Sequence, residues 1–226
     1  MNFVPSLGFD HFDGDETLFK RIADDLTEKG WSVIPNAIPN ALASELFAQV
    51  QLSHESDFAP AGVGRSLDHS LNPFVRSDEI KWIEGETEAE KNWLSWTSRL
   101  QSDLNRRLFL GLFSFESHFA HYRPGTFYKK HFDAFKGHAF KDKTNRVLSV
   151  VAYLNPGWLP DDGGELVMHE ALDKDSLRVT PAFGTLVVFL SEEVLHEVLP
   201  AARDRYSIAG WFRVNNSLND HVDPPR

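Results

Sequence analysis

Two histidines and an aspartate in the second half of this sequence have the residue types and spacing of a metal centre. His131 and Asp133 are two positions apart, so on a strand their side chains point to the same face. His196, from a more distant strand, would complete the two-histidine, one-carboxylate set typical of non-haem Fe(II) sites. Such a set leaves part of an octahedral ion open to a co-substrate and dioxygen. It therefore predicts oxygen chemistry more readily than simple hydrolysis.

The His-x-Asp tripeptide alone is weak evidence for a metal site, because this chain contains it three times. His11-Phe12-Asp13 lies near the N-terminus and His221-Val222-Asp223 near the C-terminus. The first copy precedes a helical pattern, and the last has no later histidine to complete a ligand set. His131 and His196 both fall in predicted strands that one barrel could bring together. The sequence therefore favours the middle copy.

Composition limits the class of protein. The chain has 226 residues, 42% of them hydrophobic, with 18 Phe and 6 Trp, which is enough for one well-packed domain. A formal net charge of -10 argues against a broad nucleic-acid interface. Because there is no cysteine, any metal must be held by histidines and carboxylates. No segment resembles a signal peptide or membrane span, so we expect a soluble, cytoplasmic protein that binds neither nucleic acid nor a membrane.

Helical patterns occupy most of the first half of the chain and are expected to support the site. Residues 1–14 lack a period and are expected to form a flexible arm. A helical period starts at Asp15 and stops before Gly30. Thr87 followed by Glu90 is a capping-box pattern that starts another helix. The elements predicted within this helical support, residues 15–110, are helices over 15–29, 40–50 and 87–109 and strands over 31–34 and 80–83.

The pattern changes from helical to alternating at Phe113. Short alternating segments then follow one another, separated by turns such as Arg123-Pro124-Gly125 and Asp161-Asp162-Gly163-Gly164. Strands without intervening helices predict a double-stranded β-helix, the jelly-roll core of cupins. The predicted strands are 113–122, 127–133, 146–154, 164–169, 176–180, 184–190, 194–200 and 205–214. The predicted fold is mainly β with N-terminal helices (α+β): one domain over 15–214, with its jelly-roll core at 113–214 and a flexible tail at 215–226.

Two further features concern ligand binding. Residues 55–79 have few periodic apolar positions and are expected to form a long loop, a kind of segment that often covers a binding site. Arg205 opens the last predicted strand, shortly after His196. A guanidinium inside a barrel needs an anion, and a carboxylate matches its planar fork of donors best. A dicarboxylate that chelates the metal at one end would supply that anion at the other.

Other motifs surround the candidate site in a fixed order. They are Arg76 to Gly85, Tyr122 to Tyr128 leading into His131, Arg146 to Asn155, Gly163-Gly164, His196-Glu197-Val198 and Arg205-Tyr206. This ordered set covers roughly residues 60–214. It resembles the 2-oxoglutarate- and Fe(II)-dependent prolyl 4-hydroxylases, especially the hypoxia-factor branch and its bacterial relatives.

The resemblance implies a role for each matching residue. The iron ligands would be His131, Asp133 and His196. Arg205 and the Tyr153 hydroxyl would hold the distal carboxylate of 2-oxoglutarate, while Tyr122 and Tyr128 would line the same pocket. Arg146 and Trp211 would lie near the substrate entrance. The chain departs from the hypoxia-factor branch at Ala209, where that branch tends to carry threonine, so one hydrogen bond to the co-substrate is expected to be missing or replaced.

The activity implied by the resemblance is hydroxylation of a prolyl residue in a protein, with release of succinate and CO2. Fe(II), 2-oxoglutarate and O2 would take part, with ascorbate as an auxiliary reductant, and the bacterial relatives suggest a translation factor such as elongation factor Tu as substrate. The carboxylate of Asp133 distinguishes this reading from the related halogenases, which carry a small residue there. Two alternatives stay open: a hydroxylase of a free amino acid or other small molecule, and a non-catalytic metal-binding cupin-like module.

Overall fold

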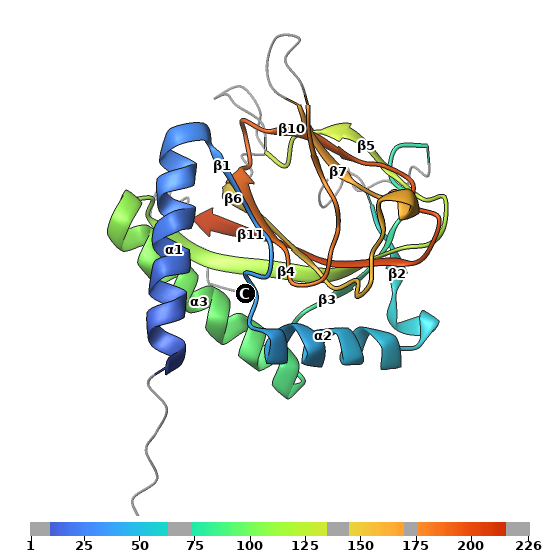
Figure 1. The fold of residues 1–226 in the computed structure, drawn as a ribbon, viewed down its shortest axis with the longest axis horizontal. Helices are drawn as coiled ribbons and strands as arrows, with labels where there is room; N and C mark the ends of the chain where they lie inside the picture. Colours follow the sequence, from blue (N-terminus) through green and yellow to red (C-terminus); the bar gives the residue numbers. More distant parts are fainter. Residues whose placement is uncertain (1–9, 63–73, 135–144, 170–175, 216–226) are drawn as a thin grey trace, which may run out of the picture.

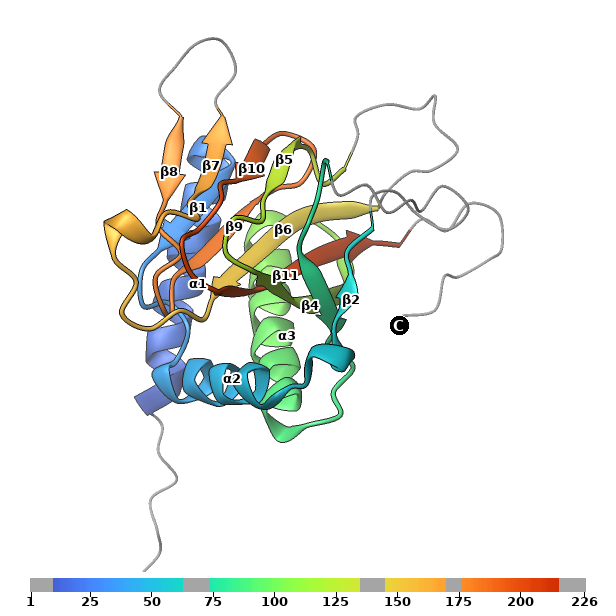
Figure 2. The same ribbon diagram turned by 90° about the vertical axis from the view of Figure 1, so that its right-hand side faces the viewer.

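Two antiparallel sheets face each other and carry the candidate site between them (Figure 1, Figure 2). The computed structural model describes residues 10–62, 74–134, 145–169 and 176–215. The major sheet contains, in spatial order, β1 (Trp31–Ile34), β9 (Leu186–Leu190), β6 (Arg146–Tyr153), β11 (Arg205–Val214), β4 (Leu112–Tyr122), β3 (Glu79–Trp82) and β2 (Ala59–Pro60). The minor sheet contains β5 (Tyr128–His131), β10 (Leu195–Val198), β7 (Leu166–His169) and β8 (Leu177–Val179). This arrangement confirms the predicted mainly β fold with a jelly-roll core.

The eight predicted jelly-roll strands correspond to β4 through β11. Six of them are shorter than predicted, and in three of these a glycine or proline at a predicted end, Gly164, Gly184 or Pro200, lies outside the strand. The central strands of the major sheet are covered on both faces, by helices on one side and the minor sheet on the other. For this reason β9 is apolar almost throughout rather than alternating.

In the described part of the chain, three α-helices cover the outer face of the major sheet: α1 (Asp10–Lys29), α2 (Asn40–Leu52) and α3 (Glu88–Leu108) (Figure 1). The start of α3 follows from its cap, because the Thr87 hydroxyl accepts a hydrogen bond of 3.2 Å from the Glu90 N–H. The Glu90 carboxylate accepts bonds from the Gly85 and Glu86 N–H groups, at 3.0 and 2.9 Å. It thus reaches further back along the chain than the predicted capping box requires. Two short 3₁₀ turns, η1 (Glu55–Asp57) and η3 (Pro160–Asp162), complete the described elements.

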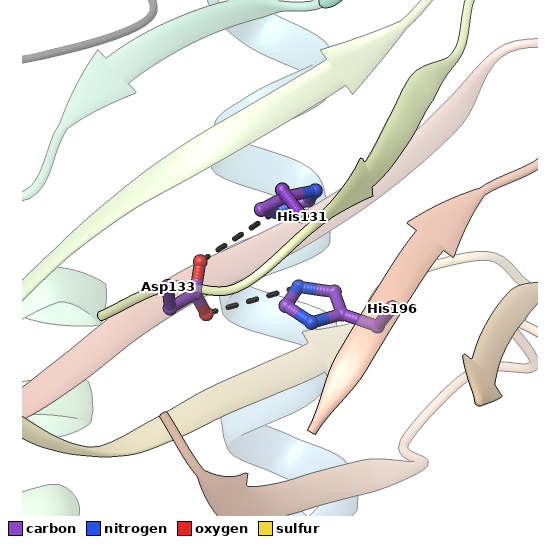
Figure 3. A group of neighbouring side chains, drawn as sticks. All are labelled: His131, Asp133 and His196. Atoms are coloured by element: carbon purple, nitrogen blue, oxygen red, sulfur yellow. Dashed lines mark ion pairs between the residues drawn. The ribbon is translucent and has the colours of Figure 1, made fainter. Parts of the chain in front are cut away.

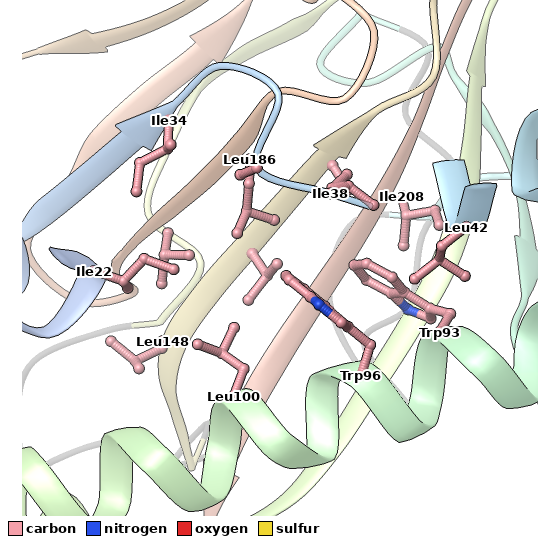
Figure 4. Close-up of a cluster of buried hydrophobic side chains, with 14 of the residues drawn as sticks. Ile22, Ile34, Ile38, Leu42, Trp93, Trp96, Leu100, Leu148, Leu186 and Ile208 are labelled. Atoms are coloured by element: carbon pink, nitrogen blue, oxygen red, sulfur yellow. The ribbon is translucent and has the colours of Figure 1, made fainter. Parts of the chain in front are cut away.

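The larger of two apolar cores lies between these helices and the major sheet (Figure 4). Trp93 and Trp96 of α3 stack with their ring centroids 5.7 Å apart, and both are almost fully buried. Their indole N–H groups are satisfied by Ser117 and Asp15, at 3.2 and 3.3 Å. The second core fills the space between the two sheets. The helices therefore stabilise the sheet from behind and leave its inner face available for the site.

Three expectations need correction or lie outside the described residues. The helix expected from Asp15 begins at Asp10, so the predicted arm over 1–14 is too long. Once a helix has formed, each added residue gains a backbone hydrogen bond, so a segment without an apolar stripe can still join it. The expected loop over 55–79 contains η1, β2 and the start of β3. Its residues 63–73, and the copy of the tripeptide at 221–223, lie outside the described ranges. Within those ranges, no helix has the length and apolar character of a membrane span.

Leu100→Ala is expected to lower the free energy of unfolding by about 3 kcal/mol, because it removes a fully buried side chain between α3 and the major sheet. Chemical denaturation measures this change. Ser98→Ala, on the exposed side of the same helix, is the matched control. Equal stability of the two variants would contradict the packing of α3 described above.

Candidate metal centre

The two candidate histidine ligands face each other across a pair of antiparallel strands. His131 ends β5 and lies directly opposite His196 of β10. The Nε2 atom of His131 is 3.6 Å from the nearer oxygen of Asp133, and that of His196 is 3.8 Å from the other (Figure 3). One ligand atom from each of the three residues lies within 4.8 Å of the others, so a single metal ion could bind all three.

Asp133 reaches the site from a bend rather than from a strand, which corrects the predicted strand over 127–133. β5 ends at His131, and the next residues leave the sheet. The Ala134 N–H donates to the Ser191 carbonyl at 3.1 Å, which holds the bend against the end of β9. Phe132 is 36% exposed, so it points away from the ligands on either side of it. The bend thus turns the Asp133 carboxylate toward the histidines, whereas a regular strand would carry this residue past them.

Backbone carbonyls fix both imidazole rings. The Nδ1 atom of His131 lies 2.7 Å from the Lys129 carbonyl, and that of His196 lies 3.0 Å from the Val194 carbonyl. Since a carbonyl only accepts, each Nδ1 carries the proton and each Nε2 keeps its lone pair for a metal. Burial lowers the pKa of His196 to about 4, so this ring is neutral at pH 7, as a metal ligand must be.

The carboxylate ligand is held in its charged form. Burial alone would raise the pKa of Asp133, but the nearby imidazoles of His196 and His131 and a hydrogen bond from Ser149 hold it well below its usual range. The Ser149 hydroxyl donates to Asp133 at 2.6 Å and lies 2.9 Å from the Ser191 hydroxyl. Two imidazoles and one carboxylate form a donor set suited to Fe(II).

The cationic end of the cavity is built around Arg205, which is only 1% exposed. Its Nε donates to the Gly164 carbonyl at 2.9 Å and its Nη1 to the Ser207 hydroxyl at 3.3 Å. Gly164 has a φ of +71°, and a side chain there would come within 3.2 Å of Arg205. Glycine is therefore required for both the turn and the close approach of the guanidinium.

Arg205 lacks a carboxylate partner among the residues that the structure describes. The Tyr153 ring lies 5.1 Å from the guanidinium, and its buried hydroxyl has no hydrogen-bond partner within the same ranges. Burial raises the pKa of Tyr153 to about 12, so this hydroxyl stays protonated and can donate. A buried cation beside a free donor fits the carboxylate of a bound anion.

The remaining predicted residues gather around the same cavity. Tyr128 stacks on His131 with ring centroids 3.5 Å apart, and Tyr122 lies 4.9 Å from the Arg205 guanidinium. Arg146 and Trp211 line the wall near the metal ligands. The structure thus brings the residues that the resemblance singled out to one cavity, with Tyr153 next to Arg205 but not among the lining residues.

Several residues that contact or line the candidate site had no predicted role. Ser149 lies on the same strand as Tyr153, and strand alternation could have placed it on the inner face. Arg76 lines the cavity and donates twice to Asp78, at 2.6 and 2.9 Å. His118 is buried next to Trp211, and burial together with the charge of Arg76 lowers its pKa to about 4. Arg76 and Asp78 are close in sequence, whereas the contacts of Ser149 with Asp133 and of His118 with Trp211 join residues far apart in the chain, which no sequence signal paired.

Ala209, the departure from the hypoxia-factor branch, lines the cavity. It lies on the same face of β11 as Ser207, whose hydroxyl already accepts from Arg205. The hydrogen bond expected from threonine at position 209 is therefore absent on the protein side. Ser207 is the described hydroxyl nearest in sequence on that face.

Ser149→Ala is expected to weaken divalent metal binding about tenfold or more, because Asp133 loses the donor that orients it. Titration with Mn(II) under matched conditions measures the change. Ser32→Ala is the control, since the Ser32 hydroxyl also donates to a carboxylate, Asp25 at 2.7 Å, on the opposite side of the major sheet. Unchanged metal affinity in Ser149→Ala would show that Asp133 does not depend on this bond.

Known proteins match this chain in sequence and in fold. The model of the 2OG-Fe(II) oxygenase superfamily matches residues 117–213. A prolyl-4-hydroxylase from Pseudomonas putida is 42% identical, with a TM-score of 0.77, and the match covers 88% of this chain and 100% of that one. A prolyl hydroxylase from Trichoplax adhaerens, solved with a hypoxia inducible factor peptide fragment, is 27% identical, with a TM-score of 0.80 and coverage of 92% and 94%.

A hypoxia-inducible factor prolyl hydroxylase from Caenorhabditis elegans is 24% identical over 206 residues. The match covers 83% of this chain but only 27% of that protein, so this chain spans about a quarter of the length of that relative. The ordered motifs, the jelly roll and the identity with the bacterial enzyme agree. The chain belongs to the prolyl 4-hydroxylase family of the 2OG-Fe(II) oxygenase superfamily, whose members use Fe(II), 2-oxoglutarate and O2.

Proposed function

We propose that this protein hydroxylates a prolyl residue of a protein substrate, with Fe(II) and 2-oxoglutarate, and releases succinate and CO2. The observation that carries the proposal is the pairing of two sites in one cavity. A two-histidine, one-carboxylate group lies near a buried arginine that has no carboxylate partner among the described residues. A dicarboxylate co-substrate would satisfy both.

Each residue has a distinct task in this proposal. His131, Asp133 and His196 would hold the iron, and Arg205 with the Tyr153 hydroxyl would bind the distal carboxylate of 2-oxoglutarate. The bound iron would supply the oxygen chemistry that couples decarboxylation of 2-oxoglutarate to hydroxylation of a C–H bond. Tyr122 and the buried strands around it exclude water from this chemistry.

The part of the cavity wall formed by Arg146 and Trp211 would receive the substrate. The half-exposed Trp82 is in edge contact with His118, which in turn contacts Trp211. The Trichoplax adhaerens relative was solved with a peptide of hypoxia inducible factor, which supports a peptide substrate for this family member too. Resemblance to bacterial relatives supports a translation factor such as elongation factor Tu, with the target proline in a loop that can enter the cavity.

Incubation with Fe(II), 2-oxoglutarate and proline-containing peptides, including peptides from elongation factor Tu, is expected to add one oxygen atom to proline. Mass spectrometry detects the product, and succinate is measured in parallel. His131→Ala should abolish the reaction, whereas His11→Ala and His221→Ala should leave it unchanged. Oxidation of free amino acids alone would favour the small-molecule alternative, and metal binding without any succinate would favour a non-catalytic module.

Arg205→Ala is expected to raise the apparent 2-oxoglutarate constant about 100-fold, because the carboxylate loses its charged partner, while metal affinity changes little. Steady-state kinetics and Mn(II) titration separate the two effects. Arg205→Lys retains the charge without the planar fork and should give a smaller increase. Arg203→Ala, two residues earlier and 45% exposed, is the control. Loss of metal binding in Arg205→Lys would contradict the assigned role.

A further inference from the structure

Glu116, a carboxylate that does not line the cavity, holds the guanidinium of Arg146 at the cavity wall. Arg146 donates from Nε and Nη2 to one oxygen of Glu116, at 3.0 and 2.8 Å. The other Glu116 oxygen accepts from Arg213 at 3.3 Å. The side chains of Arg146 and Glu116 are only 17% and 20% exposed, so this ion pair is mostly withdrawn from water. Held this way, Arg146 lies over the indole of Trp211, 3.6 Å from the ring centroid.

A β-bulge creates this arrangement. In the pairing of β11 with β6, Phe212 faces Leu148 but Arg213 faces Arg146, so Val147 is skipped. Regular alternation would instead place Val147 opposite Arg213, on the inner face, and Arg146 on the helix side. With the bulge, Val147 packs against the helix-side core and Arg146 faces the cavity. Trp211 lies directly opposite Glu116 on β4, so Glu116 reaches Arg146 across it.

The cavity contains three arginines, and their partners differ. Arg76 is bound to Asp78 and Arg146 to Glu116, whereas Arg205 has no carboxylate partner among the described residues. Within the described lining, Asp133 is the only carboxylate. Without Glu116, Arg146 would lose its carboxylate partner and would no longer be held over Trp211.

Arg146 and Trp211 still have hydrogen-bond donors available. Arg146 Nη1 forms no hydrogen bond with the described residues. The Trp211 indole N–H is buried and likewise has no partner among them. Peptide carbonyls are the natural acceptors for such donors, and the stacked pair offers them a flat apolar surface as well.

We propose that Glu116 is a positioning residue that reserves Arg146 for the peptide substrate by holding its guanidinium over Trp211. This inference rests on the proposed prolyl hydroxylation. Glu116 acts through Arg146 and touches neither iron nor 2-oxoglutarate. Its removal should therefore affect the peptide constant separately from the co-substrate constant.

The test compares Glu116→Gln, Arg146→Gln and the double variant on a peptide that the wild-type enzyme hydroxylates. Glu116→Gln is expected to raise the KM for peptide about tenfold, the scale of one lost charge-assisted hydrogen bond, with the KM for 2-oxoglutarate within about twofold. In the Arg146→Gln background the same change should have no further effect on the peptide KM. Glu88→Gln, which removes one exposed carboxylate paired with Lys91 on α3, is the control for charge alone.

Three results would overturn the inference: an unchanged peptide KM in Glu116→Gln, an equal rise in both constants, or effects of the two substitutions that multiply. Thermal denaturation of each variant separates these results from loss of folding. If the wild-type enzyme consumes 2-oxoglutarate but hydroxylates no prolyl peptide, the proposed function fails, and the inference fails with it. If the wild-type enzyme hydroxylates the peptide and Glu116→Gln has the same peptide KM, the inference is wrong but the proposed function still holds.

Discussion

Charge buried between the two sheets must be compensated, and this requirement organises the cavity. A guanidinium or carboxylate withdrawn from water is costly unless another charge or a set of hydrogen bonds replaces its hydration. Asp133 meets the requirement with Ser149 and two imidazoles, and Arg146 meets it with Glu116. Arg205 is left with neutral acceptors from the chain. Arg205, whose charge has no carboxylate partner among the described residues, is therefore the residue best suited to bind an anionic ligand.

The scaffold provides these contacts through details that interrupt regular strands. A bend after β5 turns Asp133 toward the histidines. A bulge in β6 brings Arg146 to the inner face, and Gly164 permits the close approach of Arg205. Bulges and glycines of this kind redirect side chains where ideal strands would misplace them. The helices pack behind the major sheet, and Val147 beside the bulge in β6 joins that helix-side core.

The chain belongs to the prolyl 4-hydroxylase family, and the arginines that line its cavity differ in their partners. The candidate iron ligands and Arg205 line the same cavity as Arg146 and Trp211, but Arg146 is held over Trp211 by its own carboxylate partner, Glu116. Binding of co-substrate and binding of substrate can then be adjusted by different residues. Two features of this chain concern these two kinds of binding: the lack of a hydroxyl at Ala209 concerns the co-substrate, and Glu116 concerns the substrate.

The sequence by itself determined the element types and the main chemical groups. Alternation and turn residues predicted the jelly-roll strands, and order along the chain selected His131 and His196 over the other histidines. Only the tertiary structure decided which groups meet. Local periodicity reports which face of a strand is buried, but contacts between strands depend on register, and skipping a single residue reverses a side chain's face. For that reason Arg205 could be found from its position, whereas its lack of a carboxylate partner and the Glu116 clamp became visible only in the assembled sheets.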